Sequence, residues 1–126
     1  MNKEQCAEII ARLSPDGKQM LEEHIVLYGE VLLHILASEL IAEPLIELLR
    51  GNEQVELIVE YCSLIELMWR DGDDNVVNVV DVTILERLSD EEKIWYQFGI
   101  YISDEFKKYI NEEQIPSNLM MPRLFL

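Results

Sequence analysis

The stretch "EQVELIVEYCSLIELMWRD", Glu53 to Asp71, decides the fold. On a helix with about 100° per residue, its apolar side chains occupy two faces. A helix that is apolar on two sides needs neighbours on two sides, so we predict an all-α, layered stack of helices. The first face holds Val55, Ile58, Val59, Cys62, Ile65 and Trp69, and the second holds Leu57, Tyr61, Leu64 and Met68.

The preceding segment, "EVLLHILASELIAEPLIELLRG" from Glu30 to Gly51, has helical spacing and forms either one long helix or two. Pro44 lacks an amide proton and crowds the preceding turn, so we expect a kink or a break near Ala42. Glu39, Glu43, Glu47 and Arg50 fall on one stripe of this segment, and nearly all its other side chains are apolar.

Two further helices are expected before this segment, over residues 3–13 and 18–28. "SPDG" separates them, and Gly29 ends the second or bends it. The inward face of the second helix is predicted to consist of Met20, Leu21, Ile25 and Tyr28 (or Leu27).

The valine-rich segment "DDNVVNVVDVTILERL" favours a strand by propensity, but its apolar positions have helical spacing, so we predict a helix. Ser89, with Glu92 three residues later, resembles a capping box and opens an aromatic-rich last helix. We therefore expect five or six helices in a single domain, residues 1–126. The apolar tail, residues 117–126, is expected to be ordered and irregular, packed on the body or on a neighbouring chain.

The charge is strongly negative and unevenly distributed. The 126 residues include 25 acids and 10 bases, a net charge of −15, and residues 19–86 alone carry 15 acids and two bases. Such a surface repels nucleic acids and anionic membranes and favours a basic protein partner, although solubility alone also explains it. No apolar run is long enough to span a membrane, and the N-terminus lacks a secretion signal, so we expect a cytoplasmic protein.

Acidic residues at helical spacing are the candidate partner-binding residues. The fragment "RDGDDN" also resembles the start of an EF-hand loop, but Val76 and Val82 occupy the positions that need glycine and glutamate. We instead expect Asp71 and Gly72 to end one helix and Asp73 or Asp74 to cap the next. The full candidate set is Glu39, Glu43, Glu47, Glu53, Glu56, Glu60, Asp71, Asp73 and Asp74.

Evidence for chemistry is weak. His34 and Ser38 lie one turn apart and are expected to form a buried hydrogen-bonded pair. His24, Glu30 and His34 are the alternative, a weak metal site. No phosphate-binding loop occurs, and the two cysteines, Cys6 and Cys62, are expected to be reduced and buried. We therefore expect neither an enzyme nor a cofactor.

The stretch "EEHIVLYGEVLLHILASEL", Glu22 to Leu40, resembles a group of small, acidic, helical and uncharacterised bacterial proteins. They share a Tyr-Gly-Glu step followed by a histidine, matched here by Tyr28, Gly29, Glu30 and His34. Leu33 departs from the proline that several of them carry before the histidine. Some members look like immunity proteins of toxin systems, so the resemblance implies a class and no particular site.

The favoured expectation is a cytoplasmic immunity-type inhibitor that masks a basic toxin, such as a nuclease, with its acidic face. The alternative is a helical adaptor or homodimer that uses the last helix or the apolar tail. A metal-binding protein or an enzyme is the third possibility.

Overall fold

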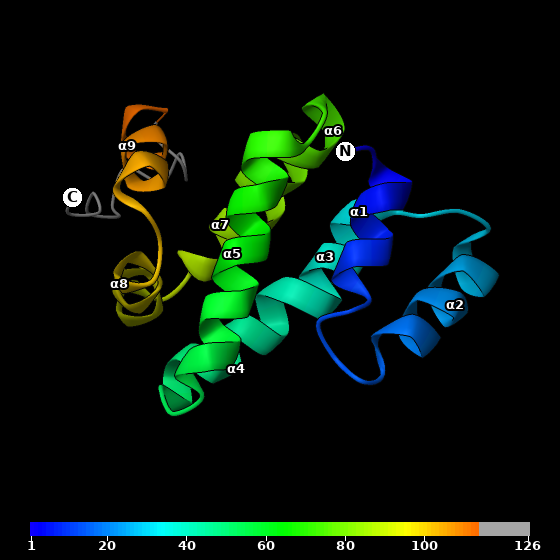
Figure 1. The fold of residues 1–126 in the computed structure, drawn as a ribbon, viewed down its shortest axis with the longest axis horizontal. Helices are drawn as coiled ribbons and strands as arrows, with labels where there is room; N and C mark the ends of the chain where they lie inside the picture. Colours follow the sequence, from blue (N-terminus) through cyan, green and yellow to red (C-terminus); the bar gives the residue numbers. More distant parts are fainter. Residues whose placement is uncertain (114–126) are drawn as a thin grey trace.

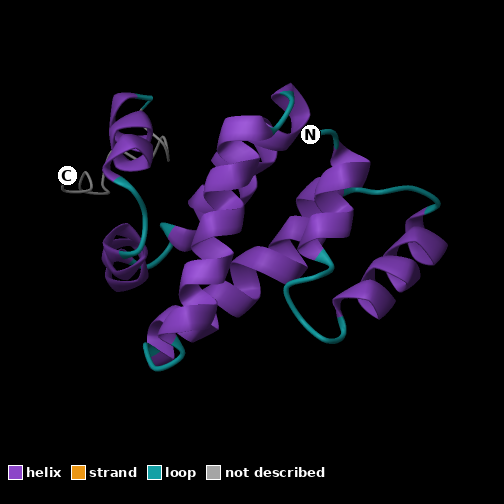
Figure 2. Ribbon diagram, in the orientation of Figure 1, coloured by secondary structure: helices purple, strands orange, loops and turns teal. Residues whose placement is uncertain are grey.

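The computed structural model describes residues 1–113, and every regular element in this range is helical (Figures 1 and 2). The prediction of an all-α fold is therefore confirmed. The predicted tail, residues 117–126, lies outside the described residues. The elements are α1 (Lys3–Ile10), α2 (Gly17–Tyr28), α3 (Leu33–Ala37), η1 (Ser38–Ala42), α4 (Glu43–Gly51), α5 (Val55–Asp71), α6 (Asp74–Val79), η2 (Val80–Ile84), α7 (Leu85–Leu88), α8 (Glu92–Ile100) and α9 (Asp104–Glu112).

Two of the helices contain a π-helical turn, η1 and η2, and continue through it. The segment α3–η1–α4 is one such helix and α6–η2–α7 is the other. Counting each once gives seven helices in residues 1–113, compared with the five or six predicted. The predicted last helix is two, because the chain leaves the helical path at Tyr101 and begins α9 after Ser103.

Pro44 does not break its helix, which instead contains a π turn directly before the proline. The amide of Glu43 donates to the carbonyl of Ser38, five residues back, so the backbone widens into a π turn just before the proline. Ala42 and Glu43 both keep right-handed helical dihedral angles. The wider turn accommodates the proline, and the helix continues to Gly51.

Helix α5 is the central element, as its two apolar faces predicted (Figure 1). It packs against α4 on one side and against α6 and η2 on another. Val55 and Val59, predicted to be apolar core residues, are instead 46% and 44% exposed. The buried side chains of α5 are Ile58, Tyr61, Cys62, Leu64, Ile65, Glu66 and Met68.

The two helices with π turns pack side by side, η1 against η2 and α3 against α6. His34 Nδ1 lies 2.6 Å from Thr83 Oγ1, and the guanidinium of Arg87 donates to Ser38 Oγ. The predicted buried His34–Ser38 pair is therefore wrong. The two side chains share a helix face, but that face adjoins the neighbouring helix, which supplies a separate partner to each.

Helix α2 lies at the edge of the molecule, on the opposite side from α8 and α9 (Figure 1). It packs mainly against α1 and buries only Gly17, Leu21 and His24. The prediction that Met20, Ile25 and Tyr28 (or Leu27) face inward is wrong, because one neighbouring helix covers only a narrow stripe of α2.

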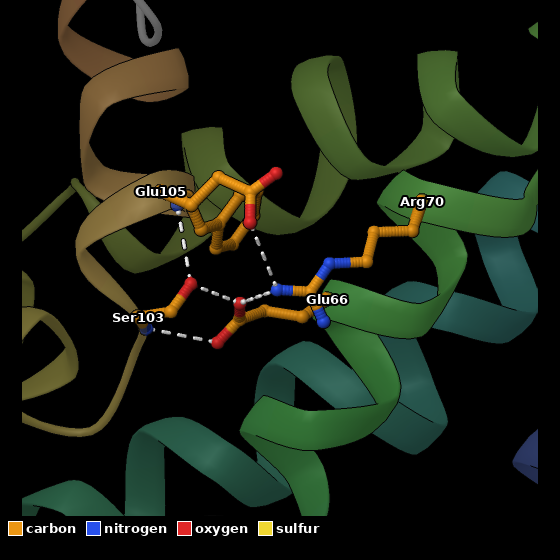
Figure 3. A network of polar contacts seen from close by, with 5 residues as sticks. Glu66, Arg70, Ser103 and Glu105 are labelled. Carbon is orange, nitrogen blue, oxygen red and sulfur yellow. Dashed lines mark hydrogen bonds and ion pairs between the residues drawn. The ribbon is translucent and has the colours of Figure 1, made fainter.

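A polar cluster fastens α9 to α5 (Figure 3). The buried carboxylate of Glu66 accepts hydrogen bonds from the Ser103 amide, at 3.0 Å, and from the Ser103 hydroxyl. Ser103 Oγ in turn accepts from the amide of Phe106, at 3.2 Å, and so caps α9. Arg70 lies within 3.3 Å of Glu66 and 3.6 Å of Glu105.

An aromatic contact adds to this attachment. The ring of Trp69, on α5, lies 4.9 Å from that of Phe106 and 5.1 Å from that of Tyr109, centroid to centroid. The hydroxyl of Tyr109 donates to the carboxylate of Asp81, at 2.9 Å, and thereby reaches η2. Both inner faces of α8 and α9 are therefore occupied within the molecule.

Candidate functional site at the α4–α5 corner

The turn between α4 and α5 holds the candidate site. Helix α4 ends at Gly51, and Asn52 follows in the left-handed conformation, with φ of 50°. Asparagine tolerates this conformation better than most residues. Gln54 takes the capping position of α5. The Asn52 side chain instead accepts a hydrogen bond from Tyr101, which holds the turn in place.

Two adjoining hollows meet at this corner, with volumes of about 580 and 290 Å³. They share Glu53, Gln54 and Leu57, so we treat them as one surface and call it the acidic hollow. Apolar side chains from both α4 and α5 line it. The lining consists of Pro44, Glu47, Leu48, Gly51, Glu53, Gln54, Val55, Glu56, Leu57, Glu60 and Tyr61.

Among residues 1–113, the acidic hollow is lined by four carboxylates and by no lysine or arginine. Within residues 1–113, Glu53, Glu56 and Glu60 are exposed and form no ion pair, whereas Glu47 pairs with Arg50. The charge also affects the neighbouring Tyr61. Burial raises the pKa of its hydroxyl, and the negative charge of Glu60 raises it further. The surface therefore combines unpaired negative charge with apolar side chains.

A second groove, of about 380 Å³, lies between α4, α7 and α8 and differs in its charge balance. Glu43 forms an ion pair with Arg87, at 3.6 Å, and Arg50 pairs with Glu91 as well as with Glu47. The hydrogen bond that Arg50 donates to Glu91, and the negative charge of Glu91, raise the pKa of the Arg50 guanidinium. Arginines of the chain itself already pair with Glu43, Glu47 and Glu91 in this groove, so it is the weaker candidate for a basic partner.

The structure thus brings together part of the predicted acidic set. Glu47, Glu53, Glu56 and Glu60 line the acidic hollow. Glu43 lines the second groove, and Glu39 is exposed on η1.

The three aspartates lie elsewhere, beyond the C-terminal end of α5. This helix has 17 residues and is about 25 Å long at about 1.5 Å per residue. Asp73 accepts a hydrogen bond from the amide of Val76, at 3.0 Å, and so caps α6 as predicted. The carbonyl of Asp71 accepts from the N-terminal ammonium group, at 2.7 Å. Asp74 is exposed in the first turn of α6.

The alternative metal site does not assemble in the part of the chain that the structure describes. No group of three or more histidine, cysteine or acidic side chains is placed there to hold a metal ion. His24 is buried, and its Nε2 accepts from the amide of Leu32 at 3.0 Å. Glu30 pairs with Lys3 at 3.1 Å, and His34 contacts Thr83, so each candidate ligand has a separate partner.

The sequence matches the model of one protein family. A family model described as "Domain of unknown function (DUF7674)" matches residues 5–116. The chain belongs to the DUF7674 family. The DUF7674 match covers the acidic hollow and α1 through α9 except for the first residues of α1. No curated protein and no solved structure matches the sequence.

The Tyr-Gly-Glu and histidine motif of this DUF7674 chain lies at the α2–α3 junction. Tyr28 packs against the ring of His24, with centroids 4.8 Å apart. Gly29 has φ of 78° and ends α2, since glycine adopts this conformation without strain. Glu30 and His34 then link the junction to α1 and η2. The described contacts of the motif thus hold the junction together.

Cys6 and Cys62 are free and buried, as predicted. Burial raises the pKa of both thiols to about 12, so both are protonated and poor nucleophiles at neutral pH. Within residues 1–113, no helix is long and apolar enough to cross a membrane.

Sequence reasoning missed Leu48 and the role of Tyr101 at the corner. Leu48 is one apolar residue among many in its helix, and Tyr101 is one of several aromatic residues between positions 95 and 109. Its hydrogen bond reaches a residue 49 positions earlier, and no local pattern indicates such a contact.

Proposed function

We propose that this DUF7674 chain is a protein-binding module, an immunity-type inhibitor that neutralises a basic toxin in the cytoplasm. The observation that carries the proposal is the acidic hollow. Three carboxylates that form no ion pair within residues 1–113, Glu53, Glu56 and Glu60, surround apolar side chains at the helical corner. This arrangement fits a partner that presents lysine or arginine side chains.

Charge and apolar contact would contribute differently to binding. Exposed carboxylates add little to affinity one at a time, but together they steer a basic protein and accelerate association. The methylene stems of lysine and arginine pack on apolar surface while their charged ends reach a carboxylate. Leu57 and Val55 offer such a surface beside Glu53 and Glu56.

A nuclease is the toxin class that fits best. An enzyme that binds a phosphate backbone needs a positively charged cleft. A row of carboxylates on one helical turn and the preceding loop presents a comparable density of negative charge. An inhibitor with this surface covers the cleft and excludes the nucleic acid.

The test begins with a tagged pull-down from the native host, followed by purification and toxicity assays of the retained basic protein. Association is then measured with a triple variant, Glu53→Gln, Glu56→Gln and Glu60→Gln. The control neutralises three exposed acids elsewhere, Glu4, Glu8 and Glu86, and so matches the change in net charge.

We expect the variant at the hollow to associate about ten-fold more slowly at low salt, with the difference shrinking at high salt. The control variant is expected to associate at nearly the rate of the unmodified protein. Equal rates for both variants would show that only net charge matters. An unchanged rate for the hollow variant, or a partner without toxicity, would refute the proposal.

A further inference from the structure

Helix α2 carries the most exposed apolar side chains of the described protein. Val26 is 85% exposed and Leu27 is 73% exposed. Ile25, Tyr28 and Met20 are 41%, 40% and 37% exposed. Scattered exposed apolar residues are common, but five within nine residues of one helix form a patch that indicates an interaction surface.

The attachment of α2 leaves this patch free. On the inner side, Leu21 and His24 are buried against the body, and the Leu32 amide donates to His24. At its start, Gly17 approaches α1 so closely that a Cβ atom would lie 2.1 Å from the carbonyl oxygen of Ala11. The apolar side chains in the C-terminal half of the helix, Ile25, Val26, Leu27 and Tyr28, remain exposed.

The directions in which the exposed apolar side chains of α2 point indicate the shape of the surface that can bind them. Ile25, Val26 and Leu27 are consecutive, so they point in directions about 100° apart and together span about 200°. A flat surface or a single helix can cover only one of these directions. A concave groove can enclose all three, as in proteins that bind a helix in a groove.

The negative charge of α2 and its flanking residues indicates a partner groove with a positively charged rim. The segment from Asp16 to Glu30 contains four acids, Asp16, Glu22, Glu23 and Glu30, and one base, Lys18. A second copy of the chain would present the same negative segment and a net charge of −15. A contact of one short helix with its copy is also small beside the roughly 1,200 Å² or more of a stable interface.

We infer that α2 is a docking helix that inserts into an apolar groove with a basic rim on another protein. Val26 and Leu27 are its main anchors, and Glu22 and Glu23 contact the rim. This surface is separate from the acidic hollow, and the inference does not depend on the proposed inhibitory function.

The test uses the full chain with a photo-activated cross-linking residue at position 26 or 27, expressed in the native host. The matched control carries the same residue at Ile100, an isolated apolar side chain that is 68% exposed. We expect one discrete cross-linked protein from positions 26 and 27 and none from position 100. The cross-linked peptide is expected to come from an apolar groove flanked by lysine or arginine.

Affinity for that purified protein is then measured with the double variant Val26→Ser and Leu27→Ser. Loss of two buried apolar anchors is expected to weaken binding on the order of 100-fold, and Ile100→Ser is expected to have no effect. Both positions are exposed, so thermal unfolding of the double variant should match that of the unmodified protein. Cross-links to a second copy, no cross-link above the control, or unchanged affinity would each overturn the inference.

Discussion

The hydroxyl of Tyr101 donates a 2.7 Å hydrogen bond to Oδ1 of Asn52. This contact joins the end of α8 to the turn between α4 and α5, across 49 positions of sequence. Because the turn carries Glu53, the contact also fixes one wall of the acidic hollow. The shape of the acidic hollow therefore depends on a helix that does not line it.

Substitution Tyr101→Phe is expected to loosen this turn without unfolding the protein. One partly exposed hydrogen bond contributes about 0.5–1.5 kcal/mol to stability. Backbone amides near Asn52 should exchange hydrogen faster, while amides in the middle of α5 should not. A double-mutant cycle with Asn52→Gly, which suits the left-handed conformation, isolates the pairwise contribution. A coupling energy of zero would show that the hydrogen bond does not stabilise the turn.

Glu66 is expected to be among the most important polar side chains for stability. Its truncation in Glu66→Ala would leave the buried amide of Ser103 without its acceptor and remove the link from α5 to α9. We expect the free energy of unfolding to fall by about 2–4 kcal/mol, as measured by chemical denaturation. Glu60→Ala is the control on the same helix, where an exposed acid should change stability by less than about 0.5 kcal/mol. Similar effects for the two variants would contradict the assignment.

Gly17 and Gly51 are expected to respond oppositely to alanine. A Cβ atom at Gly17 would meet the backbone of Ala11 and push α2 away from α1, which we expect to cost about 1–3 kcal/mol. A Cβ atom at Gly51 meets nothing within 4 Å, so Gly51→Ala should be neutral or stabilising by up to about 1 kcal/mol. Thermal unfolding of both variants checks the pair. Equal destabilisation would argue against close packing of α2 on α1.

Asp81 is expected to give stability an unusual pH dependence. Burial raises the pKa of its carboxyl above the ordinary 3.8, despite the hydrogen bond from Tyr109, which lowers it. The folded state then binds the proton more tightly than the unfolded state. Asp81 therefore favours folding below its ordinary pKa, and this contribution is lost as the pH rises through the higher folded pKa.

Asp81→Asn keeps an acceptor for the Tyr109 hydroxyl and removes the titration. Relative to the unmodified protein, the variant should be more stable at neutral pH than at about pH 3.5. Urea denaturation at both pH values measures this difference. A difference between the two proteins that does not vary with pH would contradict the raised pKa.

Much of the fold could be predicted because helical spacing is a local property. The two apolar faces of α5, the helical valine segment and the cap at Asp73 all follow from neighbouring residues. The boundary at Ser103 also had a local signal, since a serine followed by Asp104 and Glu105 is typical of a helix start. We overlooked it because the aromatic spacing continued across it.

The remaining features depend on how helices pair. Periodicity indicates an apolar face of α2 but not how many neighbouring helices cover it. Met20, Ile25 and Tyr28 (or Leu27) were therefore predicted to face inward, although they are exposed. His34 and Ser38 found partners 49 residues away, on η2 and α7. The sequence predicted the acidic residues of the hollow as a charge pattern. It did not predict which of them stay without an arginine partner, because Glu43 pairs with Arg87, which is distant in sequence.

The π turn η1 makes this segment tolerant of a change in chain length. Its bond from Glu43 to Ser38 encloses one residue more than an α-helical turn does. Deleting one residue from a regular α-helix would rotate everything beyond it by about 100°. Deleting the exposed Glu39 would instead convert the π turn to an α-helical turn and leave the directions of α3 and α4 nearly unchanged. Leu45 and Leu49 would then stay in the core, and Glu47 would stay at the hollow. In this segment, therefore, a frame-preserving deletion of one codon would be less damaging than the same deletion in α5.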